Sequence, residues 1–208
     1  IMSSDWSSDV CSSDLGKPAI SKNSKYEKLI KGVQIDKYIL KEHQNQISQG
    51  NIEYLNSKKF EKIYKGQKLM HSKHERIALQ GLTGINEKTR LKCTILPKGY
   101  YLANSANYLL PAHQIETKCL LALLNSKLIN YVFKCKSTNS NVNGYEVDEL
   151  PIIIPEKQQD YISLVDKIFE AKTKSLYADI EKYERQIDDL VFKLYEMKKE
   201  EVDTIKNK

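Results

Sequence analysis

The chain has 208 residues, of which 40% are hydrophobic, so it can bury a core and belongs to neither the disordered nor the fibrous class. Lys and Arg number 33 against 27 Asp and Glu, and the net charge of +6 is only mildly basic for a nucleic-acid binder. Apolar runs such as residues 119–124 and 150–154 are far shorter than the roughly 20 residues of a membrane-spanning helix, so we expect a cytoplasmic protein without membrane contact.

The first segment differs from the rest of the chain. Residues 5–15 repeat Ser-Ser-Asp and carry the only Trp, whereas the sequence that follows is rich in Lys, Ile and Asn. We interpret residues 1–16 as a non-native, adapter-like peptide and exclude them from the fold. We therefore expect the protein to be truncated at its N-terminus, with a recognition domain at 17–155 and a helical segment at 156–208.

Two basic segments precede residue 97. Residues 68–80 predict a strand that ends in a turn at Gly81, and residues 89–96 alternate apolar with basic side chains. The second segment predicts a half-buried strand whose outer face carries Arg90 and Lys92. Basic residues concentrate between 57 and 90, which suits one phosphate-facing surface, although a Lys-rich solvated surface would show the same pattern.

The middle of the chain predicts a strand, a helix and a polar loop. Residues 100–110 are rich in strand-forming side chains and end at Pro111, while residues 117–133 place a row of Leu on one helical face. Residues 134–144 hold many short hydrogen-bonding side chains and contain no Leu, Ile or Phe. We expect this segment to be a solvated loop that is accessible to a partner.

The C-terminal segment predicts helices. Residues 157–205 contain neither Pro nor Gly, and their apolar positions recur at spacings of three, four and seven. This pattern predicts a long helix or a helical hairpin, packed either within the molecule or against a second copy. The expected fold class is α+β, in which a small mixed or antiparallel sheet with packed helices is followed by the C-terminal helical segment.

The order of these segments resembles a known family. The runs YYLANSANYLLP, LLALLNSKLINYVF and STNSNVNGYEVDELPIIIP are similar to the C-terminal target-recognition domain of adenine-specific DNA methyltransferases and type IIG restriction-modification enzymes, the TaqI-like specificity domain. KGVQIDKYIL is similar to the segment that opens such domains, and IDDLVFKLYEM to the one that closes these enzymes. The resemblance covers roughly residue 26 to the C-terminus. It implies duplex DNA as partner, together with a catalytic methyltransferase domain on the parent chain or a partner subunit.

Catalytic motifs are absent from the sequence. An adenine methyltransferase needs a glycine-rich turn for S-adenosylmethionine and an Asn/Asp/Ser-Pro-Pro-Tyr/Phe tetrapeptide for a flipped base, yet none of the five prolines are adjacent. His71 and His74 lack further ligands at zinc-binding spacing. We expect no catalytic residue, metal or cofactor in this chain, and S-adenosylmethionine only in the parent enzyme.

On this interpretation, cations neutralise phosphates and amides meet base edges, although each amide could instead cap a turn. The candidate DNA-binding residues are Lys73, Arg76, Gln80, Lys88, Arg90, Lys92, Asn104, Asn107, Lys136, Asn139 and Asn141. Three hypotheses remain: a noncatalytic DNA-specificity module of an adenine-N6 methyltransferase, half of a specificity subunit of a multisubunit type I restriction system, or a helical protein-interaction module.

Overall fold

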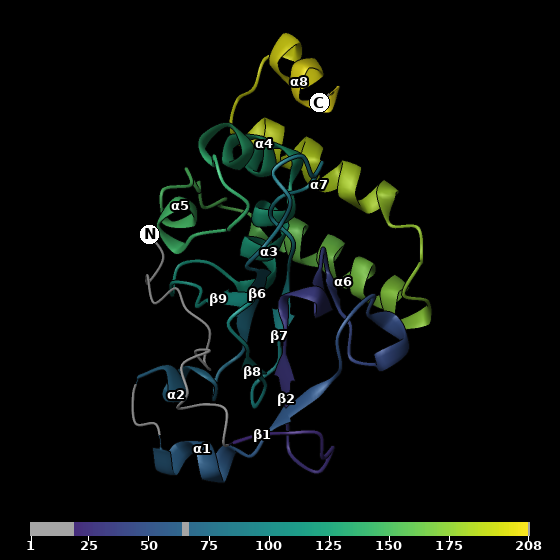
Figure 1. Cartoon of the computed structure of the whole chain (residues 1–208). Coiled ribbons are helices and arrows are strands. Elements are labelled where there is room, and N and C mark those ends of the chain that lie inside the picture. Colours follow the sequence, from purple (N-terminus) through teal and green to yellow (C-terminus); the bar gives the residue numbers. More distant parts are fainter. Residues whose placement is uncertain (1–18, 64–66, 208) are drawn as a thin grey trace.

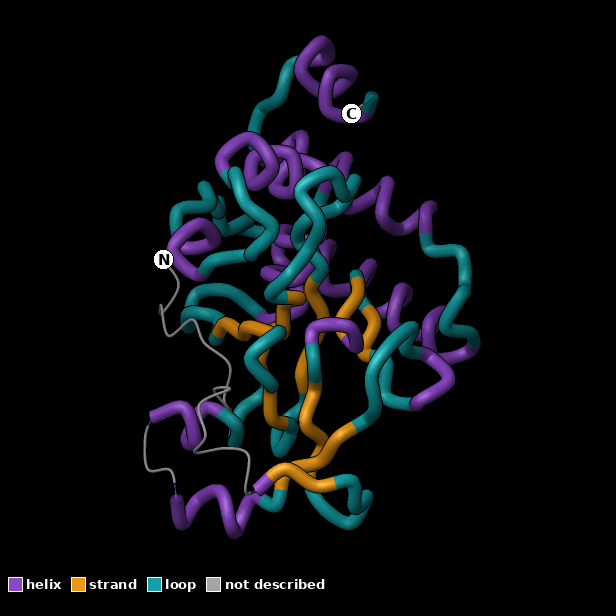
Figure 2. The backbone as a smooth tube through the Cα atoms, in the orientation of Figure 1, coloured by secondary structure: helices purple, strands orange, loops and turns teal. Residues whose placement is uncertain are grey.

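The computed structural model describes residues 19–63 and 67–207 (Figure 1). The strands gather in one part of the molecule, and most of the helices cover the other (Figure 2). The expected α+β class is confirmed. The segment interpreted as adapter-like lies outside the described residues.

Two small sheets and a hairpin form the strand region. The first sheet has the order β1-β5-β2-β8, in which only β2 and β8 run parallel. The second sheet is antiparallel, with the order β7-β6-β9, and β3 and β4 form the hairpin. The strands are β1 (Ile20–Ser21), β2 (Glu27–Ile30), β3 (Ile35–Asp36), β4 (Ile39–Leu40), β5 (Glu53–Leu55), β6 (Arg76–Gln80), β7 (Cys93–Leu96), β8 (Tyr101–Leu102) and β9 (Ala106–Leu109). Two short helices, α1 (Ser57–Ile63) and α2 (Gln67–His71), lie between β5 and β6.

The strand expected at residues 100–110 is divided between the two sheets. A turn closed by the hydrogen bond from Ala106 N to Ala103 O separates β8 from β9. Leu29 and Ile30 pair with β8, whereas β9 pairs with β6. The segment is therefore extended as expected, but the prediction of one continuous strand is wrong, because each half completes a different sheet.

The helix expected at residues 117–133 is also divided. It forms α3 (Thr117–Asn125) and α4 (Lys127–Lys136), and Ser126 between them has an extended backbone. The Ser126 hydroxyl accepts a hydrogen bond from Ile129 N and donates one to Leu123 O, so one side chain satisfies both helix ends. Residues 119–125 are all buried, so the expectation of a single apolar face is wrong for α3.

Of the two arrangements that the sequence allowed for the C-terminal segment, the structure has the helical hairpin, formed by α6 (Gln158–Lys174) and α7 (Glu181–Leu194). A third helix, α8 (Lys199–Lys206), follows it. These helices pack on α3 and α4, and their buried side chains share one core with Ile77 and Leu79 of β6. The apolar positions are therefore satisfied within the molecule. None of the helices in the described part of the chain is both long and apolar enough to cross a bilayer.

Candidate nucleic-acid interface

The predicted DNA-binding residues fall at the two ends of β6. This strand has five residues, which corresponds to about 13 Å between its first and last Cα atoms. Lys73 and Arg76 lie at its beginning, whereas Gln80 ends it beside the loops that carry most of the other candidates. The residues grouped at this second end are Gln80, Arg90, Lys92, Asn104, Asn107, Asn139 and Asn141. Lys136 lies apart on the last turn of α4, where its ammonium group donates to Glu149 O.

Three loops meet at the Gln80 end, and we call residues 81–90, 103–107 and 137–143 the loop edge. Backbone hydrogen bonds join them: Gly81 N donates to Ser105 O, Thr83 N to Ser140 O and Val142 N to Gly81 O. Gly81 is needed for this junction, because an added Cβ would lie 2.9 Å from Ser105 O. The loop edge is therefore a cross-linked surface rather than three independent loops.

The amides of the loop edge divide into exposed and structural groups. Asn104 and Asn141 have exposed side chains. Asn107 donates through Nδ2 to Val142 O at 2.9 Å, and Asn139 Oδ1 accepts from Asn141 N at 2.8 Å. The turn-capping role that the sequence left open thus applies to Asn139, while Asn107 links β9 to the polar loop.

Arg90 does not lie on an exposed strand face, so that expectation is wrong. It is 1% exposed, and its Nε donates to Thr83 Oγ1 at 2.8 Å while Nη2 donates to Asn139 O at 2.7 Å. Nη2 also contacts Ser137 Oγ at 3.4 Å, and the guanidinium lies over the Phe133 ring at 5.4 Å. Burial lowers the pKa of the Arg90 guanidinium. An irregular loop lacks the backbone hydrogen bonds of a β-sheet, so its carbonyl groups need other donors, and Arg90 supplies them.

Arg76 is likewise inside the protein. It is 0% exposed, its guanidinium lies 4.6 Å from the Tyr108 ring centroid, and Nη2 donates to Tyr100 O at 2.5 Å. The Tyr108 hydroxyl is in turn 2.8 Å from His71 Nδ1. The expected surface position of Arg76 is wrong, because its side chain joins the two sheets where β8 and β9 diverge.

Two buried amides hold the end of the loop edge and β7 to the helices, and the sequence interpretation missed both. Asn130 Oδ1 accepts from Arg90 N and Leu91 N at 3.1 and 2.8 Å. Asn125 pairs with the backbone of Cys93, accepting from its N–H at 3.1 Å and donating to its carbonyl at 3.0 Å. Because β7 is at the edge of its sheet, Asn125 covers backbone groups of Cys93 that no strand pairs with. Asn130 covers the backbone N–H groups of residues 90 and 91, which precede β7. The sequence feature that could have revealed them is that Asn125 and Asn130 interrupt the apolar helical pattern of residues 117–133.

Apolar side chains are also exposed at the loop edge. Leu82 and Ile85 are 55% and 52% exposed, on a segment whose backbone is anchored at Gly81 and Thr83. Exposed apolar groups beside amides match the mixed contacts that protein side chains make with thymine methyl groups and base edges in the major groove. Among the described residues, no group of three His, Cys, Asp or Glu side chains could hold a metal ion.

The fold resembles that of a restriction-modification enzyme. The whole chain matches part of the Type IIL restriction-modification enzyme MmeI, solved in complex with DNA, with a TM-score of 0.60 and 9% sequence identity. The chain spans 36% of the length of that enzyme. No family model matches the sequence, and no curated protein matches it either. The likeness therefore defines the class of fold, one related to restriction-modification enzymes.

Proposed function

We propose that this chain is the DNA-specificity module of a restriction-modification adenine-N6 DNA methyltransferase. The observation that carries the proposal is the match of the entire chain to a part of an enzyme solved with DNA. The resemblance of residues 26–208 to the TaqI-like specificity domain points the same way from sequence. In this proposal, catalysis and S-adenosylmethionine binding belong to another domain of the parent chain or to a partner subunit in the cytoplasm.

The loop edge is the proposed base-reading surface. It presents exposed Asn104 and Asn141, and an amide side chain can form paired hydrogen bonds with adenine in the major groove. Arg90 and Asn130 act behind it as positioning residues, because they hold residues 81–90 and the loop that carries Asn141, while Gly81 N joins the loop that carries Asn104 by donating to Ser105 O. Held in this way, the loops lose little conformational entropy on binding DNA.

The helical segment supports this assignment over an oligomerisation module. Ile187 and Val191 on α7 are 1% and 0% exposed and pack in the molecule's own core. A dimer seam would need those side chains at the surface. The principal apolar stripe of α7 is therefore not available to a second copy.

A selection experiment tests the proposed function. The full chain is incubated with a pool of random duplexes over a range of salt concentrations from about 50 mM upward, and the retained DNA is sequenced. We expect an enriched short motif and an affinity that falls steeply with salt. Absence of binding at the lowest salt concentration would contradict the proposal.

A pair of matched variants links the result to the loop edge. We expect Asn104→Ala with Asn141→Ala to lower the enrichment of the motif by roughly tenfold or more, since each correct base contact contributes about 1–3 kcal/mol. Gln159→Ala with Gln186→Ala removes two exposed amides from α6 and α7 and serves as the control. Equal enrichment by both variants would exclude the loop edge as the base-reading surface.

A further inference from the structure

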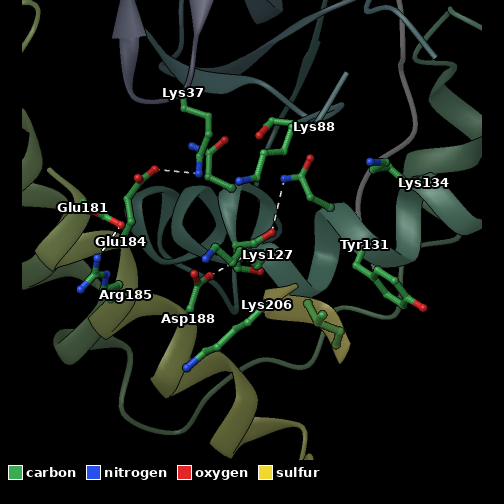
Figure 3. Close-up of a pocket in the computed structure, with 15 residues that line it drawn as sticks. Lys37, Lys88, Lys127, Tyr131, Lys134, Glu181, Glu184, Arg185, Asp188 and Lys206 are labelled. Atoms are coloured by element: carbon green, nitrogen blue, oxygen red, sulfur yellow. Dashed lines mark hydrogen bonds and ion pairs between the residues drawn. The ribbon is translucent and has the colours of Figure 1, made fainter. Parts of the chain in front are cut away.

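A pocket of about 260 Å³ lies where the start of α4 meets α7, α8 and residues 88–89 (Figure 3). Side chains of both signs line it, and cations outnumber carboxylates. The cations are Lys37, Lys88, Lys127, Lys134, Arg185 and Lys206, and the carboxylates are Glu181, Glu184 and Asp188.

Some of these charges neutralise one another. Lys37 pairs with Glu184 at 2.7 Å, and Arg185 pairs with Glu181 at 2.6 Å. Lys206 pairs at 3.2 Å with Asp189, which is outside the pocket lining.

Asp188 is satisfied differently. It is 4% exposed and accepts a hydrogen bond from the backbone N–H of Lys127, the first residue of α4, at 2.8 Å. Burial raises the pKa of this carboxyl group. Asp188 therefore lies at the N-terminus of α4, where the helix dipole stabilises a negatively charged side chain.

Three of the six cations that line the pocket are not paired with a carboxylate in the described part of the chain. Within residues 19–63 and 67–207, the ammonium groups of Lys88, Lys127 and Lys134 make no ion pair or hydrogen bond. Lys88 and Lys127 are exposed and Lys134 is half-buried. The pocket therefore offers positive charge to a ligand from outside the chain.

The spacing of these lysines suits a strand of DNA. Lys127 and Lys134 are seven positions apart on α4, which places them on one helix face about 10 Å apart along the axis. Each strand of a duplex carries one phosphate for about every 3.4 Å of axis, so this separation corresponds to about three phosphate steps. Lys88 adds a third cation from a different segment.

The pocket is continuous with the loop edge. Lys88 and Thr89 line it immediately before Arg90, whose side chain joins the loop at 81–90 to the loop at 137–143. Asn130, which also lines the pocket, accepts hydrogen bonds from the backbones of Arg90 and Leu91. A duplex on the amides of the loop edge would therefore have its backbone beside these lysines.

We propose that this pocket binds backbone phosphates of duplex DNA through Lys88, Lys127 and Lys134. This inference rests on the proposed function and extends it, since Lys127 and Lys134 were not among the residues expected from sequence. Lysines at the pocket set the register of the duplex, and the amides of the loop edge discriminate bases. A small phosphate ligand shares the same chemistry, and the experiment separates the two.

The test compares two triple variants of the full chain that change charge equally. Lys88→Gln, Lys127→Gln and Lys134→Gln remove the pocket cations, while Lys98→Gln, Lys167→Gln and Lys193→Gln remove three exposed lysines elsewhere. The dependence of log affinity on log salt concentration is measured on the motif recovered from selection. We expect the pocket variant to lose about 2.7 from the magnitude of the slope, at about 0.9 per phosphate contact, with an unchanged base preference. The control should keep a slope close to that of the unmodified chain.

Each outcome separates this inference from the proposed function. An unchanged slope in the pocket variant, or an equal loss in both variants, overturns the pocket assignment while DNA binding by the unmodified chain stands. If the unmodified chain binds no DNA, the proposed function fails, and inorganic phosphate is titrated while the lysine Nζ resonances are followed by NMR. Saturable shifts confined to the three pocket lysines would then assign a small phosphate ligand and overturn the DNA assignment. Retained far-ultraviolet circular dichroism and urea midpoint confirm that both variants fold.

Discussion

The sheet-and-loop region, residues 19–157, and the helical region, residues 158–207, are stabilised differently. The first contains fully buried Arg76 and Arg90 and the buried amides of Asn125 and Asn130. The second relies on an apolar stripe, and its ion pairs Lys174–Glu170 and Arg185–Glu181 are exposed. Helices satisfy their own backbone, whereas irregular loops need side chains to do so, and this difference explains why most of the buried polar groups lie in the first region. The buried polar side chain of the second region, Asp188, accepts from the backbone N–H at the start of α4.

The two regions also differ in the kind of surface that they present. Loops that are cross-linked by Arg90 and Asn130 can hold exposed side chains in one arrangement, as a specific binding surface requires. The helices cover the other side of the core and present mostly charged surface. Substitutions should therefore affect the two regions by different mechanisms.

The largest expected effect comes from breaking the polar centre of the sheet-and-loop region. Arg90→Ala leaves the oxygens of Thr83, Ser137 and Asn139 without their buried donor and removes a large side chain from the Phe133 ring. We expect a loss of about 3–5 kcal/mol in the free energy of unfolding, measured by urea denaturation. Amide hydrogen exchange of residues 137–142 should accelerate most.

Arg90→Lys sharpens that result. Lysine keeps the positive charge but cannot donate to Thr83 and Asn139 in the geometry of a guanidinium fork. We expect it to recover less than half of the lost stability. Full recovery would mean that charge alone, rather than the forked hydrogen bonds, holds the loop edge.

An intermediate effect is expected from the apolar stripe. Ile187→Ala on α7 removes buried methyl groups that pack in the shared core, and we expect a loss of about 2–4 kcal/mol by urea denaturation. Unlike the Arg90 variants, it should leave local exchange in residues 137–142 unchanged, because Ile187 makes no hydrogen bond to that loop. Faster exchange there would show that the two regions are coupled more strongly than their contacts indicate.

The smallest effect is expected from a surface ion pair of the helical region. Asp189→Asn breaks the contact with Lys206 at 3.2 Å, in which both side chains are substantially exposed. We expect a change below about 0.5 kcal/mol, and none at high salt. A loss comparable to that of Ile187→Ala would contradict the view that packing rather than charge holds these helices.

Some of the structure was predictable from sequence because the signals are local. Apolar spacing indicated helices after residue 157, strand-forming residues indicated extended structure at 100–110, and Gly81 indicated the end of β6. The breaks at residues 103–105 and at Ser126 were missed, because a turn between two sheets and a serine that caps two helices depend on their surroundings. The amides of the candidate interface were recognised as a group, but the roles of Asn107 and Asn139 became clear only from their partners.

The sequence by itself determined the α+β class, the helical nature of the C-terminal segment and the polar character of residues 134–144, since composition and periodicity report which side chains can be buried. Only the tertiary structure decided which polar groups face solvent. Arg76 and Arg90 resemble surface cations in the sequence, yet both are buried, because backbone carbonyls from distant segments meet there and need donors. Lys88, Lys127 and Lys134 line one pocket because α4 and residues 88–89, which are far apart in sequence, are brought together by the long-range hydrogen bonds of Asn130 and by the packing of Arg90 on Phe133.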